Sequence, residues 1–131
     1  MSTAVYLDSS ALVKLAVEEP ESQALRKHLR RRRTWVTSAL ARTEISRALL
    51  PGGEPALAAG RSVLARCDLV RVDDRVLNVA GTLRPLELRS LDAIHLATAG
   101  RLGQQLSQLI TYDARMASAA RALGYRVGAP A

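Results

Sequence analysis

The chain has 131 residues and a single cysteine. No uninterrupted apolar run approaches the length of about 20 residues that a membrane helix needs. We therefore expect one domain over residues 1–131, with no internal disulfide and no membrane span. No basic segment followed by a long apolar run opens the sequence, which predicts a cytoplasmic protein rather than a secreted one. The formal net charge is +7, and all basic residues except Lys14 and Lys27 are arginines. Arginine suits bidentate binding of phosphate, although a GC-rich genome produces the same bias.

Short apolar runs alternate with amphipathic stretches along the whole chain. Five strands are expected, at residues 3–8, 34–38, 68–72, 105–113 and 125–128. Helices are expected between them, at residues 9–17, 21–33, 39–50, 54–67, 73–83, 89–102 and 113–123. This alternation predicts an α/β fold in which a mostly parallel sheet is covered by helices on both faces. In such sheets ligands bind outside the carboxyl ends of the strands.

Four acidic residues stand out from the others, which lie in polar connections or at expected helix starts. Asp8 closes the first strand and Asp113 closes the strand QLITYD, so parallel strands would bring both carboxylates to one edge of the sheet. Asp92 interrupts an apolar helix start, and Glu44 lies in mid-helix on the face that carries Ile45. We expect these four side chains to converge on one pocket.

Helix capping is the competing interpretation for three of these acids. Asp8, Asp92 and Asp113 each precede or begin an expected helix, where a carboxylate accepts backbone hydrogen bonds worth about 1 kcal/mol. Glu44 is too far inside its helix to act as a cap, and its alternative is an ordinary surface position. Capping and catalysis are compatible, because an aspartate at the end of a strand can do both.

Converging carboxylates repel one another unless they are protonated or bind a cation. Hard oxygen ligands without a nearby thiolate suit Mg²⁺, with Mn²⁺ as the alternative. Such an ion can activate water and neutralise charge on a phosphoryl group. Arginines around the acidic centre would then hold a polyanion, and the densest positive segment ends in Arg30, Arg31, Arg32 and Arg33. The alternative for that segment is a solvated helix end. His95 is expected to be a packed, hydrogen-bonded core histidine rather than a general base.

Four segments in this order carry a resemblance to a known family: VYLDSSALVKL, ARTEISRAL, LRSLDAIHLATA and LITYDARMASAARALG. Together they resemble the PIN-domain ribonucleases, and among these the VapC toxins of bacterial toxin–antitoxin pairs. The resemblance implies a PIN-like α/β/α sandwich. It also implies a catalytic metal site at Asp8, Glu44, Asp92 and Asp113, with Ser9 and Thr111 as auxiliary hydroxyls. The implied activity is Mg²⁺- or Mn²⁺-dependent cleavage of tRNA, rRNA or mRNA.

The same resemblance implies a homodimer and a cognate VapB-type antitoxin as partner. A non-catalytic module that binds RNA or a protein partner through the same fold is the alternative, with the acids serving only as caps. Two other phosphate enzymes fit less well. A haloacid-dehalogenase-type phosphatase needs an aspartate where Ser10 stands, and a response-regulator receiver needs a late lysine that this chain lacks.

Overall fold

The computed structural model describes residues 3–131, which fold around one five-stranded sheet in the order β3-β2-β1-β4-β5. Every neighbouring pair of strands is parallel. The strands are β1 (Ala4–Leu7), β2 (Trp35–Ser38), β3 (Asp68–Val70), β4 (Leu106–Ile110) and β5 (Val127–Gly128). The predicted parallel α/β architecture is confirmed, and the five strands fall within the expected ranges.

The connections between strands are helical, as the alternating pattern predicts. The α-helices are α1 (Ser9–Ala16), α2 (Ser22–Leu29), α3 (Ala41–Leu49), α4 (Gly53–Ala65), α5 (Asp74–Ala80), α6 (Ser90–Gly100) and α7 (Ala114–Ala122). Two single 3₁₀ turns, η1 (Leu50–Gly52) and η2 (Gly103–Gln105), complete the chain. Within residues 3–131 no helix is both long and apolar enough to cross a membrane.

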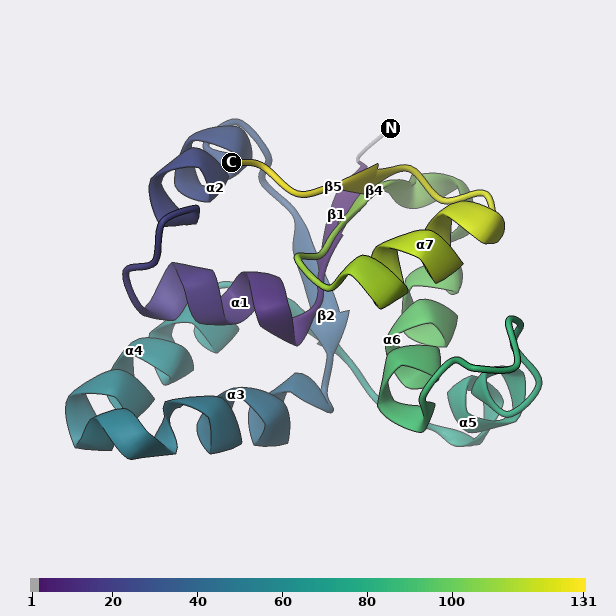
Figure 1. Ribbon diagram of the computed structural model, residues 1–131, viewed down its shortest axis with the longest axis horizontal. Helices are drawn as coiled ribbons and strands as arrows, with labels where there is room; N and C mark the ends of the chain where they lie inside the picture. Colours follow the sequence, from purple (N-terminus) through teal and green to yellow (C-terminus); the bar gives the residue numbers. More distant parts are fainter. Residues whose placement is uncertain (1–2) are drawn as a thin grey trace.

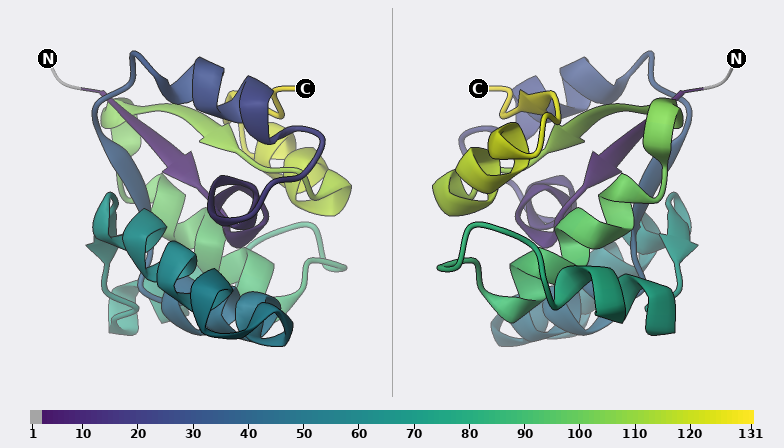
Figure 2. Two further views of the ribbon diagram at one scale, coloured as in Figure 1. Left: turned by 90° about the vertical axis from the view of Figure 1, so that its left-hand side faces the viewer. Right: turned by 90° about the vertical axis from the view of Figure 1, so that its right-hand side faces the viewer.

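The helices cover the sheet in two layers, with α1 to α4 on one face and α5 to α7 on the other (Figure 1 and Figure 2). Alternation along β1 explains the two cores. Val5 and Leu7 pack with the α1–α4 layer, whereas Tyr6 packs with Leu96 of α6 in the opposite layer. Apolar residues therefore fill both faces, as expected for a parallel sheet that is buried on both sides.

Helix α2 is shorter than the sequence predicts. The expected helix over residues 21–33 ends at Leu29, and Arg31 to Arg33 form a connection to β2. Leu25 and Leu29 are fully buried, but none of the four arginines that follow offers an apolar side chain to the core. The helix therefore ends with its last packing residue, and the extension of this helix to residue 33 is wrong.

The sheet has a topological switch point between β1 and β4. The chain leaves β1 towards β2 on one side, whereas β4 continues to β5 on the other side. Residues Leu7 and Ile110 are paired at the carboxyl ends of these strands, and the Asp8 amide donates to the Ile110 carbonyl oxygen at 3.3 Å. Crevices at switch points are the usual ligand sites of open α/β sheets.

The α6 core provides a direct test of this packing. We expect Leu96→Ala to lower the free energy of unfolding by about 2–5 kcal/mol, because Leu96 is fully buried between sheet and helix. Leu86→Ala is the matched control, since Leu86 is 78% exposed and should change stability by less than about 0.5 kcal/mol. Urea denaturation of both variants measures the difference, and equal midpoints would contradict the assigned core.

Candidate active site

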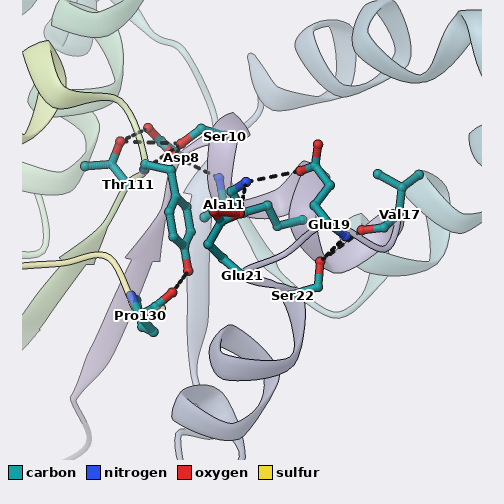
Figure 3. Close-up of polar contacts among 11 residues, drawn as sticks. Asp8, Ser10, Ala11, Val17, Glu19, Glu21, Ser22, Thr111 and Pro130 are labelled. Atoms are coloured by element: carbon teal, nitrogen blue, oxygen red, sulfur yellow. Dashed lines mark hydrogen bonds and ion pairs between the residues drawn. The ribbon is translucent and has the colours of Figure 1, made fainter.

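Asp8 lies at the switch point, immediately after β1, and begins helix α1. Its extended backbone allows Oδ1 to accept hydrogen bonds from the Ala11 amide at 3.1 Å and from Ser10 Oγ at 2.6 Å. Oδ2 accepts a hydrogen bond from Thr111 Oγ1 at 2.5 Å (Figure 3). Thr111 follows β4, so donors from two separate strand ends hold one carboxylate. The predicted capping role of Asp8 is confirmed.

Burial makes the Asp8 carboxylate costly to ionise. The side chain is almost fully enclosed, and this burial raises its pKa; the hydrogen bonds from Ser10, Thr111 and Ala11 oppose the shift without cancelling it. A cap alone has no need of burial, because a solvated carboxylate would accept the same backbone hydrogen bond. The capping role alone therefore does not explain why this carboxylate is buried.

Glu44 is connected to the centre of the sheet through His95. Its Oε1 lies 2.6 Å from His95 Nε2, and His95 Nδ1 lies 2.7 Å from the Tyr6 hydroxyl. The pKa of Tyr6 is strongly raised by burial and by the charge of Asp8, so its phenol stays protonated and donates to Nδ1. Because Nδ1 accepts from the Tyr6 phenol, the ring donates through Nε2–H to Glu44 Oε1. The prediction that His95 is a buried, hydrogen-bonded histidine is confirmed.

Asp92 shows that the four acids share one electrostatic environment. It lies in the first turn of α6 and is half-buried. Desolvation raises its pKa, and so do the charges of Asp113, Asp8 and Glu44, while His95 lowers it. Asp92 does not cap its helix, because the cap position is Arg89. The interpretation of Asp92 as an N-cap is therefore wrong, and its first-turn position stands.

Asp113 is the most open of the four. It is exposed and caps α7, where Oδ1 accepts from the amides of Arg115 at 2.9 Å and Met116 at 3.3 Å. Its own amide donates to Thr111 Oγ1 at 3.1 Å, so the same threonine contacts Asp8 and Asp113. Asp113 thus forms the rim of the acidic site, and Asp8 its floor.

The donor set fits a hard divalent cation by its chemistry. All four acids offer carboxylate oxygens; burial raises the pKa of Asp8 and of Asp92, and the charges of Asp113, Asp8 and Glu44 raise that of Asp92 further, which a cation would offset. Within residues 3–131, no three acidic, histidine or cysteine side chains already form a group that could hold a metal ion. Asp8 and Glu44 are instead satisfied by protein donors. Which of the four would ligate an ion stays a prediction.

Two site residues, Ser10 and Tyr6, would not have been selected from their chemistry alone. Ser10, rather than its neighbour Ser9, donates to Asp8, and the auxiliary role of Ser9 stays a prediction. Tyr6 resembles an ordinary strand residue, and the partner of His95 depends on a contact across 51 positions of the chain. The only sequence signal for Ser10 is its spacing: it lies two residues after a strand-ending aspartate at a helix start.

A pocket of about 570 Å³ adjoins Asp92. It lies between the segment before α6 and the first turns of α7, and Arg89 and Arg115 line it together with Leu88 and Ser118. Neither arginine forms an ion pair with another residue of the described chain. The pocket thus offers two cations without ion pairs, next to the carboxylates of Glu87 and Asp92, which also line it.

The arginine run predicted to bind RNA does not surround the carboxylates. Arg30 to Arg33 precede β2, at the amino ends of the strands, whereas Asp8 and Asp113 follow strands at the carboxyl ends. The structure thus separates two groups that the sequence prediction placed around one centre. Whether these arginines bind RNA stays a prediction.

Comparison with known proteins identifies the family of this α/β/α domain. The PIN domain profile matches residues 5–122. Ribonuclease VapC46 of Mycobacterium tuberculosis is 65% identical over 127 residues, which cover 97% of this chain and 98% of that protein. The chain therefore belongs to the PIN-domain family, as its motifs suggested.

Solved structures of low sequence identity share the fold. The crystal structure of Mycobacterium tuberculosis VapC20, a toxin that cleaves the sarcin–ricin loop, aligns with a TM-score of 0.77 at 16% identity and covers 96% of this chain and 99% of that one. A toxin–antitoxin complex from Klebsiella pneumoniae aligns with a TM-score of 0.66 at 20% identity, covering 83% and 86%. The predicted PIN-like α/β/α sandwich is confirmed.

The buried carboxylate predicts a stability gain from its removal. In metal-free buffer at pH 7, Asp8→Asn should raise the free energy of unfolding by about 0.5–2 kcal/mol, because asparagine can still cap α1 without a buried charge. The folded-state pKa of Asp8 is raised, so wild-type stability falls as the pH rises above the unfolded value of about 3.9. The advantage of the variant should therefore shrink as the pH falls to about 4. Thermal melts across this range measure it, and a gain independent of pH would contradict burial of the charge.

Proposed function

We propose that this protein is a divalent-metal-dependent endoribonuclease that acts as the toxin of a type II toxin–antitoxin pair. The observation that carries the proposal is the buried Asp8 carboxylate at the switch point, which shares its surroundings with Glu44, Asp92 and Asp113. Ribonuclease VapC46, the 65% identical relative, supports the choice of RNA as substrate. Mg²⁺ is the proposed cofactor, with Mn²⁺ as the alternative.

Asp8, Glu44 and Asp92 are the proposed ligands of the ion, directly or through water, and Asp113 completes the set from the rim. A divalent ion bound there would supply activated water and neutralise charge on the scissile phosphate. Thr111 and Ser10 hold the Asp8 carboxylate in one orientation through hydrogen bonds to its two oxygens. His95 does the same for Glu44 at 2.6 Å, because its ring is fixed on its other side by Tyr6.

Arg89 and Arg115 are the proposed contacts for RNA next to the scissile bond. They line the pocket beside Asp92, where two cations would hold a phosphate near the acidic site. Without them, the negative charge of the four carboxylates would repel an RNA backbone. This arrangement lets a polyanion approach an acidic centre.

A VapB-type antitoxin is the proposed protein partner. The structural similarity to a toxin–antitoxin complex from Klebsiella pneumoniae supports it. A homodimer is proposed with it, on the resemblance to VapC toxins alone.

A non-catalytic binding module is the second candidate. Two observations favour it: Asp8 and Asp113 both cap helices, and no three candidate ligands in the described chain form a ready group for a metal ion. A module of this kind would need no divalent ion. Binding of Mn²⁺ therefore separates the two candidates.

Loss of the central carboxylate should abolish cleavage. We expect Asp8→Asn to cut RNA at least about 100-fold more slowly than wild type in Mg²⁺, since even residues that only support metal ligands contribute about 10–100-fold. Asp74→Asn makes the same change at an exposed position in α5 and should leave the rate unaltered. Gel assays of a labelled RNA measure both rates. Cleavage by Asp8→Asn at the wild-type rate would refute the assignment.

The link from Tyr6 through His95 predicts a positioning role that folding alone does not explain. We expect His95→Leu to weaken Mn²⁺ binding by about 10–100-fold, because Glu44 loses the donor that orients it. His95→Gln retains a donor and should recover part of the affinity. Calorimetric titration with Mn²⁺ alone measures the effect, and thermal melts confirm folding. Equal affinities for folded His95→Leu and wild type would show that His95 serves packing only.

A further inference from the structure

A second positively charged surface lies at the opposite end of the sheet from the carboxylates. We call it the distal basic surface and define it by Lys27, Arg30, Arg31, Arg32 and Arg33. The segment connects α2 to β2 at the amino ends of the strands, and the Val5 amide donates to the Thr34 carbonyl oxygen there at 3.0 Å (Figure 1). Strands of four to five residues that rise about 3.3 Å per residue place this edge about 15 Å from Asp8.

The backbone of this surface is held in place by hydrogen bonds. Trp35 Nε1 donates to the Arg32 carbonyl oxygen at 2.8 Å, and Arg66 Nη2 donates to the Arg33 carbonyl oxygen at 2.9 Å. The Arg66 guanidinium also lies over the Trp35 ring, 4.0 Å from its centroid. Arg32 Nη1 donates to the His28 carbonyl oxygen at 2.5 Å, while the side chains of Arg30, Arg31 and Arg33 have no such bond within residues 3–131. The segment therefore presents three arginines from a fixed backbone.

The charge of this surface is not compensated by the described part of the chain. None of its five cations forms an ion pair within residues 3–131, whereas nearby Arg26 pairs with Glu18. The dipole of α2 favours cations in its last turn, which accounts for Lys27. It does not account for Arg31 and Arg33, which lie beyond the cap residue Arg30. Adjacent like charges repel one another, and a bound anion would relieve this repulsion.

Two hollows flank Arg31 and Arg32. One, of about 520 Å³, is lined by Lys27, His28 and Arg30 together with these two arginines. The other, of about 290 Å³, adds Arg33 and Thr34; Ser107 also lines it, but its hydroxyl already donates to the Ala4 carbonyl oxygen at 2.9 Å. Guanidinium donors around adjoining hollows match a row of phosphates. The Arg66 guanidinium already lies over one face of the Trp35 ring beside this surface, so that face is not open to base stacking.

We propose that the distal basic surface binds phosphates of the RNA substrate outside the catalytic site. The inference rests on the proposed ribonuclease function and specifies its substrate: an RNA long or folded enough to reach both ends of the sheet. RNA is favoured over an acidic protein because four of the five cations are consecutive arginines, whose guanidinium groups suit bidentate phosphate contacts. A fragment that occupies only the carboxylate edge would gain nothing from this surface.

Binding measured on a cleavage-inactive background tests the inference apart from catalysis. In Asp8→Asn protein, the triple change Arg30→Gln, Arg31→Gln and Arg33→Gln should weaken binding of a labelled folded tRNA by about tenfold or more and make its salt dependence shallower. Arg32 is kept because its side chain supports the His28 carbonyl. The control replaces Arg61, Arg75 and Arg121 by glutamine, which removes the same charge elsewhere and should change affinity less than about threefold.

Length dependence decides the assignment. Binding of an RNA of about four nucleotides, the lower limit of a single-strand site, should be equal with and without the triple change. Equal losses for both RNAs, or for the triple variant and its charge-matched control, would overturn the proposal. So would unchanged tRNA binding accompanied by lost binding of polyglutamate, which would indicate an acidic protein partner. If wild type binds tRNA through this surface but cuts no RNA, the catalytic proposal fails and this one stands.

Discussion

The site depends on a carboxylate placed where a parallel sheet changes direction. Asp8 follows a buried strand, and its own side chain is almost fully buried. Both carboxylate oxygens therefore need hydrogen-bond donors from the protein. The chain supplies these donors from α1 and from the end of β4, which are neighbours because β1 and β4 are paired at Leu7 and Ile110. The hydrogen bonds thus favour the charged form of Asp8, whereas burial disfavours it and raises the pKa. Opposed effects of this kind are more typical of functional than of structural positions.

Each of the other acids is held differently, and together they form a gradient of exposure. Glu44 is connected through His95 to the buried Tyr6, Asp92 is half-buried, and Asp113 faces solvent. A site closed on the inside and open on the outside can enclose an ion while leaving one side accessible to a large substrate. The helix caps at Asp8 and Asp113 are what a purely structural role would also require, but they are compatible with an ion site, because a carboxylate has two oxygens and can accept a backbone hydrogen bond while it contacts an ion.

Much of this was predictable from local sequence, and the missing parts have a common physical cause. Strand-ending aspartates predicted the correct edge because the topology of parallel sheets brings carboxyl ends together. The contact between His95 and Glu44 was not predictable, because it depends on how α6 and α3 meet across the sheet rather than on either helix alone. The end of α2 was missed because the basic pattern continued past Leu29, although the apolar positions that stabilise the helix had ended there.

The direction of the strands also explains why the arginine run and the carboxylates lie apart, which the composition does not reveal. A net charge of +7 suggests a uniformly basic protein around an acidic centre, but the strands set a distance between the arginine run and the carboxylates. Parallel strands make the two edges inequivalent: one presents helix N-termini and acids, and the other presents the connection after α2. The cations that share a pocket with Asp92 are instead Arg89 and Arg115, which come from segments without any basic run. The position of a charge relative to strand direction, and not its density along the chain, therefore determines which part of a polyanion it can contact.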